Sequence, residues 1–177
     1  MKLTRVLTTS VVALLFAVAG VSAASVSRDF DKTADFTRYK TYSWAKPVST
    51  GNELSDKRIT GALDATLAAE GWTKKDEGGD IFVAAHAILD EKQNIDTIYS
   101  GWGGGWGYHG GGMATTQVTT YIVGTLVVDL FDGASKALVW RGTATDTVTQ
   151  NPEKNEKTLT KALTKLFSKF PPEPPKK

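Results

Sequence analysis

Few residues in this 177-residue sequence could carry out catalysis. The absence of cysteine excludes a disulfide, a thiolate metal site and a cysteine nucleophile. The two histidines are His86 and His109. His86 lies in an apolar run, on the face of Phe82, Ala84 and Ile88, where a packed, hydrogen-bonded histidine is expected rather than a base. His109 lies in a glycine-rich segment that would give a general base no rigid support.

The remaining residue patterns match no known metal or phosphate site. Two histidines without regularly spaced carboxylates do not form a zinc signature. Asp29, Asp31 and Asp35 are spaced irregularly and lack the dense pattern of a calcium loop, although carboxylates in one surface turn are compatible with a calcium site. The run 101–112 contains Gly-x-Gly fragments, but no Lys-Ser/Thr pair follows and no helix opens behind it. We therefore predict no catalytic residue, no metal and no cofactor, with a small hydrolase or metal-dependent enzyme using His86 or His109 and a nearby aspartate as the alternative.

The glycine-rich run is the feature that most needs a functional explanation. Eight of the twelve residues from 101 to 112 are glycine, a density that does not hold a regular element, so we predict a loop at 100–114. The candidate contact residues are Trp102, Trp106, Tyr108 and His109. Aromatic side chains bury a large area at low entropic cost, so the loop could contact a glycan, a lipid headgroup or another envelope protein. The alternative is that the loop folds over the sheet and packs its indoles.

Residues 1–24 have the features of a secretory signal peptide. Lys2 and Arg5 precede an apolar run over residues 6–19, and the small residues that follow allow cleavage after Ala23 or Ala24. The run is shorter than the roughly 20 residues that a membrane-spanning helix needs. We expect an exported, periplasmic protein that is not transmembrane after cleavage, and a membrane-associated one if the signal is retained.

Removal of that segment also changes the charge balance. Without Lys2 and Arg5, the 21 basic residues of the full chain fall to 19, equal to its 19 acidic residues. A neutral mature chain gives no reason to expect nucleic-acid binding. The lysines at 157, 161, 165 and 169 recur every fourth residue, and we expect them to form a solvated helix face rather than a contact for an anionic surface.

The hydrophobic periodicity predicts an α+β domain. Two amphipathic helices each need an apolar surface, which one face of a mostly antiparallel sheet supplies in a two-layer sandwich. In the predicted strand at 137–150, alternation should place Leu138, Trp140, Ala144 and Val148 on one face. Gly61, inside the first helix, is expected to mark a close approach of helix and sheet. The predicted elements are two short strands within 26–44, a helix at 53–70, strands at 81–89, 121–131 and 137–150, and a helix from 152 that ends before Pro171.

The order of these elements predicts a single domain over residues 25–170, followed by a disordered Pro/Lys tail at 171–177. In this domain, Trp44, Trp72 and Trp140 sit in or beside regular elements and are expected in the core.

Several segments resemble a bacterial envelope family known as domain of unknown function 4136. The similar segments are residues 35–44 (DFTRYKTYSW), 101–107 (GWGGGWG), 121–130 (YIVGTLVVDL), 138–144 (LVWRGTA) and 170–172 (FPP). The resemblance implies an exported protein, often lipid-anchored, with no established activity and no catalytic residues to transfer. This chain lacks the lipidation cysteine, which favours a free periplasmic form.

Together these observations favour a non-catalytic periplasmic domain that binds or scaffolds envelope components. Besides the enzyme alternative above, a structural, stress-related envelope protein without a ligand is also consistent with the sequence.

Overall fold

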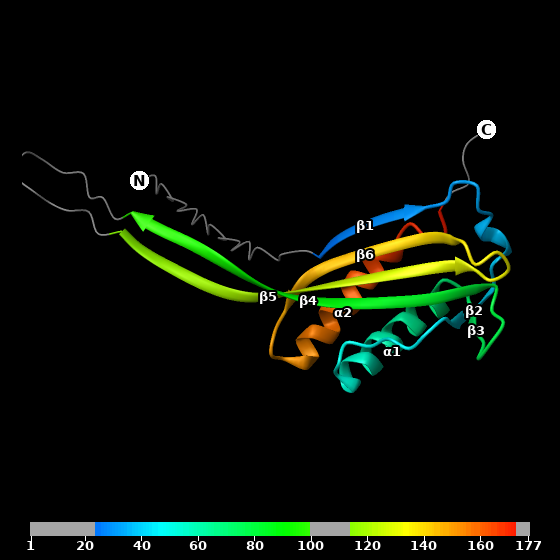
Figure 1. The fold of residues 1–177 in the computed structure, drawn as a ribbon, viewed down its shortest axis with the longest axis horizontal. Helices are drawn as coiled ribbons and strands as arrows, with labels where there is room; N and C mark the ends of the chain where they lie inside the picture. Colours follow the sequence, from blue (N-terminus) through cyan, green and yellow to red (C-terminus); the bar gives the residue numbers. More distant parts are fainter. Residues whose placement is uncertain (1–23, 100–113, 173–177) are drawn as a thin grey trace, which may run out of the picture.

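The computed structural model describes residues 24–99 and 114–172 of the chain. They form two layers, a six-stranded sheet with two helices packed on one of its faces (Figure 1). The strand order is β1-β6-β5-β4-β2-β3, and all pairings are antiparallel except those of β2 with β3 and with β4. This architecture confirms the α+β fold predicted from the sequence.

The strands are β1 (Ser25–Phe30), β2 (Thr41–Trp44), β3 (Thr73–Lys74), β4 (Ile81–Tyr99), β5 (Ala114–Asp132) and β6 (Leu138–Val148). A 3₁₀ turn, η1 (Phe36–Arg38), precedes β2, and the helices are α1 (Glu53–Ala69) and α2 (Pro152–Phe167). Although β1 and β2 follow each other in sequence, three strands separate them in the sheet. None of the helices in the described ranges has the length and hydropathy to cross a bilayer.

Alternation along the central strands places their apolar residues against the helices. Ile81 and Val83 of β4, Val128 and Leu130 of β5, and Trp140 of β6 are almost completely buried on this side. We call it the helix-side face and the uncovered side the open face. The open face of β6 carries a row of polar residues, Arg141, Thr143, Thr145 and Thr147.

One residue of the predicted apolar row of β6 lies on the other face. Leu138 was expected beside Trp140, but it pairs with Phe131 across a register shift and is 40% exposed. The irregularity leaves Val139 as an extra residue, and one extra residue reverses the alternation on its far side. The prediction for Leu138 is therefore wrong.

Helix α1 begins and ends as its sequence predicts. The Oδ1 atom of Asn52 accepts a hydrogen bond from the backbone N–H of Ser55, and Gly71 follows the helix at φ +86°. Leu63 and Leu67 are fully buried. Gly61, however, is exposed, and a Cβ atom at this position would meet nothing within 4 Å. The expected close approach of helix and sheet at Gly61 is therefore wrong.

Helix α2 is amphipathic and packs on β6 and β1. Its buried residues are Ala162, Leu163, Leu166 and Phe167. The four periodic lysines at 157, 161, 165 and 169 are exposed, as expected for a solvated face. Two hydrogen bonds fix the helix to the first strand: Arg28 Nε donates to the carbonyl of Leu166 at 2.5 Å, and Lys165 Nζ donates to the carbonyl of Ala24 at 2.5 Å.

An aromatic cluster closes the core at the end of α2. Phe170, just beyond the helix, is its centre, with ring centroids 5.2 Å from Trp72 and 5.6 Å from Trp140. The other members in contact with Phe170 are Phe36 and Phe167. Trp72 and Trp140 are thus core residues as predicted, whereas Trp44 is only partly buried.

Substituting Gly142 should show how tightly this core is packed. A Cβ atom at Gly142 would lie 2.3 Å from Cη2 of Trp140 and 2.9 Å from a methyl of Leu166. We expect Gly142→Ala to destabilise the protein by about 1–3 kcal/mol, as overpacking does. The control is Gly61→Ala, which should stabilise the exposed helix by about 0.5–1 kcal/mol. Urea unfolding of both variants measures the difference, and a stabilising Gly142→Ala would contradict this packing.

The two central strands are much longer than predicted. β4 and β5 each have 19 residues and pair along their whole length, from Ile81 with Asp132 to Tyr99 with Ala114. The sequence prediction ended β4 at residue 89 and began β5 at 121, because the residues beyond lack regular apolar alternation. β6 ends where Val148 pairs with Ile122, and β4 and β5 continue alone, away from the body (Figure 1). We call residues 91–99 and 114–122 the ribbon; beyond its first pair, Glu91 and Ile122, it is two-stranded.

Candidate functional site

The aromatic candidates in the glycine-rich loop lie outside the described residues. Trp102, Trp106, Tyr108 and His109 belong to the segment that joins the outer ends of the ribbon, Tyr99 and Ala114. Their role as contact residues therefore stays a prediction.

His86 is not the packed, hydrogen-bonded residue that its apolar neighbours suggested. It shares a face with Phe82, Ala84 and Ile88 as expected, but that is the open face, and His86 is exposed. Within the described structure, it makes no hydrogen bond or ion pair. Residues 81–89 are apolar on both faces of the strand, which suggested that both faces are covered. The two helices, however, cover only the helix-side face.

The open face also carries a buried carboxylate, Asp129, which forms an ion pair with Arg141. Both oxygens of Asp129 accept hydrogen bonds from Arg141, at 2.6 Å from Nε and 2.7 Å from Nη2. This bidentate pair joins β5 to β6. It leaves Asp129 bound to a guanidinium rather than to His86.

The described ranges contain no group of three or more His, Cys, Asp or Glu side chains that could hold a metal ion. We expect elemental analysis of dialysed protein to give no stoichiometric zinc, in the parent and equally in His86→Ala and His109→Ala. One metal ion per chain that is lost in either variant would instead favour the enzyme alternative.

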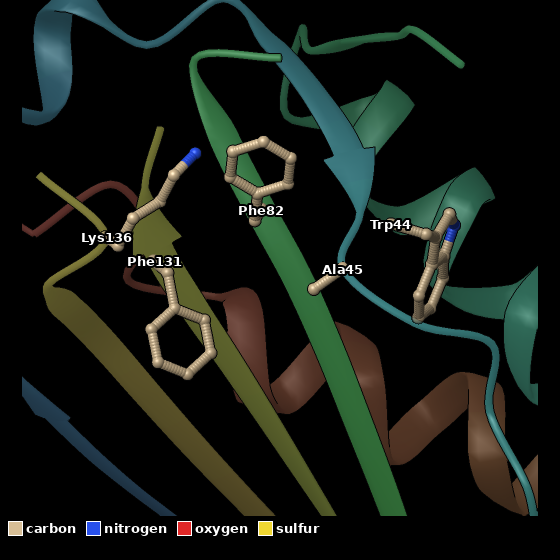
Figure 2. Close-up of a pocket in the computed structure, with 5 residues that line it drawn as sticks. All are labelled: Trp44, Ala45, Phe82, Phe131 and Lys136. Carbon is tan, nitrogen blue, oxygen red and sulfur yellow. The ribbon is translucent and has the colours of Figure 1, made fainter. Parts of the chain in front are cut away.

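A small hollow lies on the open face, near the turn between β5 and β6. Its volume is about 320 Å³, and Trp44, Ala45, Phe82, Phe131 and Lys136 line it (Figure 2). The Lys136 ammonium lies 3.9 Å from the centre of the Phe82 ring and donates to the carbonyl of Gly133 at 2.7 Å. Because the lysine is bound to groups of its own chain, the hollow offers a ligand little beyond apolar contact.

A larger groove lies on the helix-side face, between the N-terminal ends of α1 and α2. Its volume is about 490 Å³, within the range of small-molecule sites. Its floor is formed by β4, β5 and β6 where they approach the ribbon. We call it the interhelix groove; its apolar lining residues are Leu54, Ile59, Ala87, Ile88, Leu89, Leu126, Ala144, Val148, Pro152, Leu159 and Ala162.

The same capping arrangement positions the α1 and α2 walls of the groove. At α1, both the N–H and the hydroxyl of Thr50 donate to Asp56, at 2.8 and 2.7 Å. At α2, the N–H and hydroxyl of Thr149 donate to Asn155, each at 2.9 Å. An asparagine two residues after each threonine then caps the first turn of its helix. The shared pattern Thr-x-Asn-x-x-x-Asp/Asn is visible in the sequence at residues 50–56 and 149–155.

The groove is weakly charged. Its charged lining residues are Arg58, Asp146 and Glu156, and none of them forms an ion pair in the described structure. The other polar lining groups are threonine, serine and asparagine side chains. An apolar occupant held by a few hydrogen bonds suits such a surface.

The apolar lining continues from the groove onto the ribbon. Leu89, at the groove edge, is 61% exposed, and Ile122 follows at the ribbon base with 43%. Further out, the directly paired residues Ile95 and Val118 are 61% and 53% exposed. By their register, all four belong to the helix-side face. This surface was not predicted from the sequence, because its residues are separated along the chain and only the pairing of β4 with β5 brings them together.

A family model for a domain of unknown function (DUF4136) matches residues 26–172, which is most of the chain. The chain belongs to this family. No curated protein sequence matches it significantly.

Two solved structures share the fold of this DUF4136 protein at low sequence identity. A PDZ domain protein from Parabacteroides distasonis superposes with a TM-score of 0.57 at 10% identity; the match covers 85% of this chain but only 37% of that protein. The PelC dodecamer from Paraburkholderia phytofirmans gives a TM-score of 0.50 at 15% identity, covering 82% of this chain and 96% of PelC. At these identities the similarity concerns the fold alone.

The motif residues that resemble the DUF4136 family have structural roles here. Arg38 and Tyr39 both donate to Asp132 at the end of β5, the tyrosine hydroxyl at 2.8 Å. The backbone N–H of Ser135 also donates to Asp132, at 2.7 Å. The Ser135 N–H and the Tyr39 hydroxyl hold the pKa of Asp132 well below its ordinary value. These contacts fasten the segment before β2 to the turn after β5.

A second carboxylate ties β2 to helix α1. The Tyr42 hydroxyl and the Trp44 indole N–H donate to Oδ1 of Asp64, at 2.8 and 2.9 Å, and Lys74 Nζ donates to Oδ2 at 2.8 Å. Partial burial would raise the pKa of Asp64, but these three hydrogen bonds outweigh it and lower the pKa below its ordinary value. The motif at residues 35–44 thus anchors β2 at both ends.

Proposed function

We propose that this DUF4136 protein is an exported, non-catalytic protein of the cell envelope that binds or scaffolds other envelope components through the interhelix groove and the ribbon. The observation that carries the proposal is where its exposed apolar residues lie. Five of the eight exposed large hydrophobic side chains of the described ranges line the groove or lie on the helix-side face of the ribbon, namely those of Leu54, Leu89, Ile95, Val118 and Ile122.

Such a concentration is typical of an interaction surface. Soluble monomers rarely expose a contiguous apolar patch, and larger ones mark contacts with proteins, membranes or ligands. The ribbon adds a second argument, since a two-stranded hairpin with no layer covering it is marginally stable in water. The fold similarity to PelC, which is described as a dodecamer, is consistent with a scaffolding role.

The loop at the outer end of the ribbon belongs to the same proposal. Trp102, Trp106, Tyr108 and His109 would extend the contact surface beyond the ribbon, toward a glycan, a lipid headgroup or an envelope protein. Trp106→Ala should then weaken binding while costing under about 1 kcal/mol of stability, as a surface substitution does.

Export should leave Ala24 as the first residue. Ala24 is buried, and its carbonyl accepts the hydrogen bond from Lys165, so cleavage after Ala23 keeps these contacts, whereas cleavage after Ala24 removes them. The intact mass of the periplasmic protein should correspond to a chain that starts at Ala24. Recovery of a chain that starts at Met1 from the membrane fraction would contradict cleavage.

Photo-cross-linking in intact cells tests the binding role. A benzophenone amino acid at position 54, on the groove wall, should give discrete adducts with a second envelope component. The matched control is position 57 in the same helix, where the exposed Lys57 pairs with Glu53 and does not line the groove. Equal labelling from both positions, or no adduct with another component from position 54, would refute the proposed binding through the groove.

A further inference from the structure

The outer side of helix α2 carries a row of exposed lysines. Successive lysines are three or four residues apart, so they share one side of the helix, and the buried stripe that includes Leu163 and Phe167 lies on the other side. Because α2 packs on the sheet through that stripe, the lysines point away from the sheet (Figure 1). We call this row the lysine face; its members are Lys154, Lys157, Lys161, Lys165 and Lys169.

From Lys157 onward, no acidic residue interrupts the lysine face. The acidic residues of α2 are Glu153 and Glu156, both in its first two turns. The hydroxyls of Thr160 and Thr164, between the lysines, donate to carbonyls of their own helix at 3.0 and 2.9 Å. None of the five lysines forms an ion pair within the described structure. Exposure alone is also expected of a solvated face, but an unbroken row of unpaired cations is a surface of one charge.

The first strand adds a further positive charge to this surface. The Arg28 guanidinium donates to the backbone carbonyls of Lys165 and Leu166, and its Nη2 atom lies 3.1 Å from the hydroxyl oxygen of Ser168. The negative end of the helix dipole favours a cation at this place. Arg28 pairs with no carboxylate in the described part of the chain. Its charge therefore lies beside the last lysines of the face.

Helix α1 gives the lysine face a flat neighbour. Its side away from the sheet exposes Gly61, Ala65 and Ala68, which have short side chains or none. The three acidic residues of α1 are each bound within the chain: Glu53 and Asp64 by ion pairs with Lys57 and Lys74, and Asp56 by hydrogen bonds from Thr50. A flat anionic surface could therefore approach both helices at once.

We propose that the lysine face docks the protein onto a bilayer that contains anionic phospholipids, with α1 and α2 lying parallel to the membrane surface. This inference goes beyond the proposed function, because the contact uses neither the interhelix groove nor the ribbon. Lysines four residues apart are separated by about 6 Å along a helix, which is less than the Debye length of about 8 Å at physiological salt. Their attraction to lipid phosphates is therefore additive. Clusters of about four to eight basic residues on an amphipathic helix are typical of contacts with anionic lipid.

The chemistry of the face favours a membrane over a protein or a nucleic acid. Protein interfaces are depleted in lysine and depend on aromatic anchors, and the lysine face exposes no aromatic side chain. Outside the five lysines and Arg28, the chain after residue 24 has 19 acidic but only 13 basic residues. A planar bilayer touches one side of the molecule and avoids this acidic remainder, whereas a long polyanion would also meet it.

Co-sedimentation of the purified mature protein with lipid vesicles tests the docking. We expect binding to vesicles of phosphatidylcholine and phosphatidylglycerol in equal parts, and little binding to phosphatidylcholine alone. Lys161→Glu should weaken the binding at least tenfold, because it reverses one charge and each basic residue at such a surface contributes about fivefold. The matched control is Lys92→Glu, the same substitution at an exposed residue on the open face, which should bind like the parent.

Lys157→Glu is the second variant of the lysine face, and circular dichroism shows whether each variant is folded. No binding to the anionic vesicles, equal binding to phosphatidylcholine alone, or equal losses in Lys161→Glu and Lys92→Glu would overturn the proposal. Binding to a DNA duplex but not to vesicles would also overturn it and would identify a nucleic acid as the occupant. The adducts expected from position 54 in the groove do not depend on these lysines, so a failure of the docking is distinguishable from a failure of the proposed function.

Discussion

Replacing Trp140 with alanine is expected to lower the free energy of unfolding by about 3–5 kcal/mol, the usual cost of deleting a large buried aromatic side chain. Trp140 is 1% exposed, lies on the helix-side face of β6, and contacts Phe167 at a centroid distance of 4.9 Å and Phe170 at 5.6 Å. Its ring also covers Gly142, so its removal would open a cavity between the sheet and α2.

Chemical denaturation with intrinsic fluorescence or circular dichroism measures this loss. The control is Leu138→Ala, in the same strand but 40% exposed on the open face, which should cost under about 1 kcal/mol. Equal losses for the two variants would mean that the aromatic cluster is not the main packing element of this end of the core.

Replacing Asp132 with alanine is expected to destabilise the protein by about 2–3 kcal/mol, because it leaves the buried Tyr39 hydroxyl without its acceptor. The same carboxylate accepts hydrogen bonds from the backbone N–H groups of Ala134 and Ser135, so the turn between β5 and β6 should loosen as well.

This substitution should also change how stability depends on pH. The folded-state pKa of Asp132 is lowered, so its contribution is complete above the unfolded-state value of about 4 and is lost as the pH falls toward the folded value. Stability curves of the parent protein and Asp132→Ala should converge between pH 5 and pH 2, on the order of the window in which such carboxylates protonate. Asp76→Asn, at an exposed residue without a hydrogen bond in the described structure, is the control. Parallel curves for the parent and Asp132→Ala would contradict the assigned role.

The prediction of the fold succeeded where a local pattern has a single structural solution. Asn151-Pro152 begins a helix because the asparagine caps it and the proline needs no hydrogen-bonded N–H there. The alternation over 121–131 predicts a half-buried strand, and Leu126, Val128 and Leu130 do face the helices. Both signals depend only on neighbours a few residues away.

The candidate site was less predictable, because it is assembled from distant segments. Thr50 and Thr149 make equivalent caps, but only the packing of α1 beside α2 turns those two helix ends into the walls of one groove. Ile95 and Val118 look like isolated apolar residues in polar surroundings. The register of β4 with β5 pairs them and aligns them with Leu89.

The sequence by itself determined the element types, the helix ends, the two-layer class and the family resemblance, since periodicity, caps and motifs are local properties. Tertiary structure alone decided which face of each strand is covered. It exposed His86, whose neighbours are all apolar, because the two helices cover one side of the sheet and leave the other open. It moved Leu138 to the open face through one extra residue. It also extended β4 and β5 into the ribbon, because backbone hydrogen bonds between paired strands do not require the apolar alternation on which the sequence prediction depended.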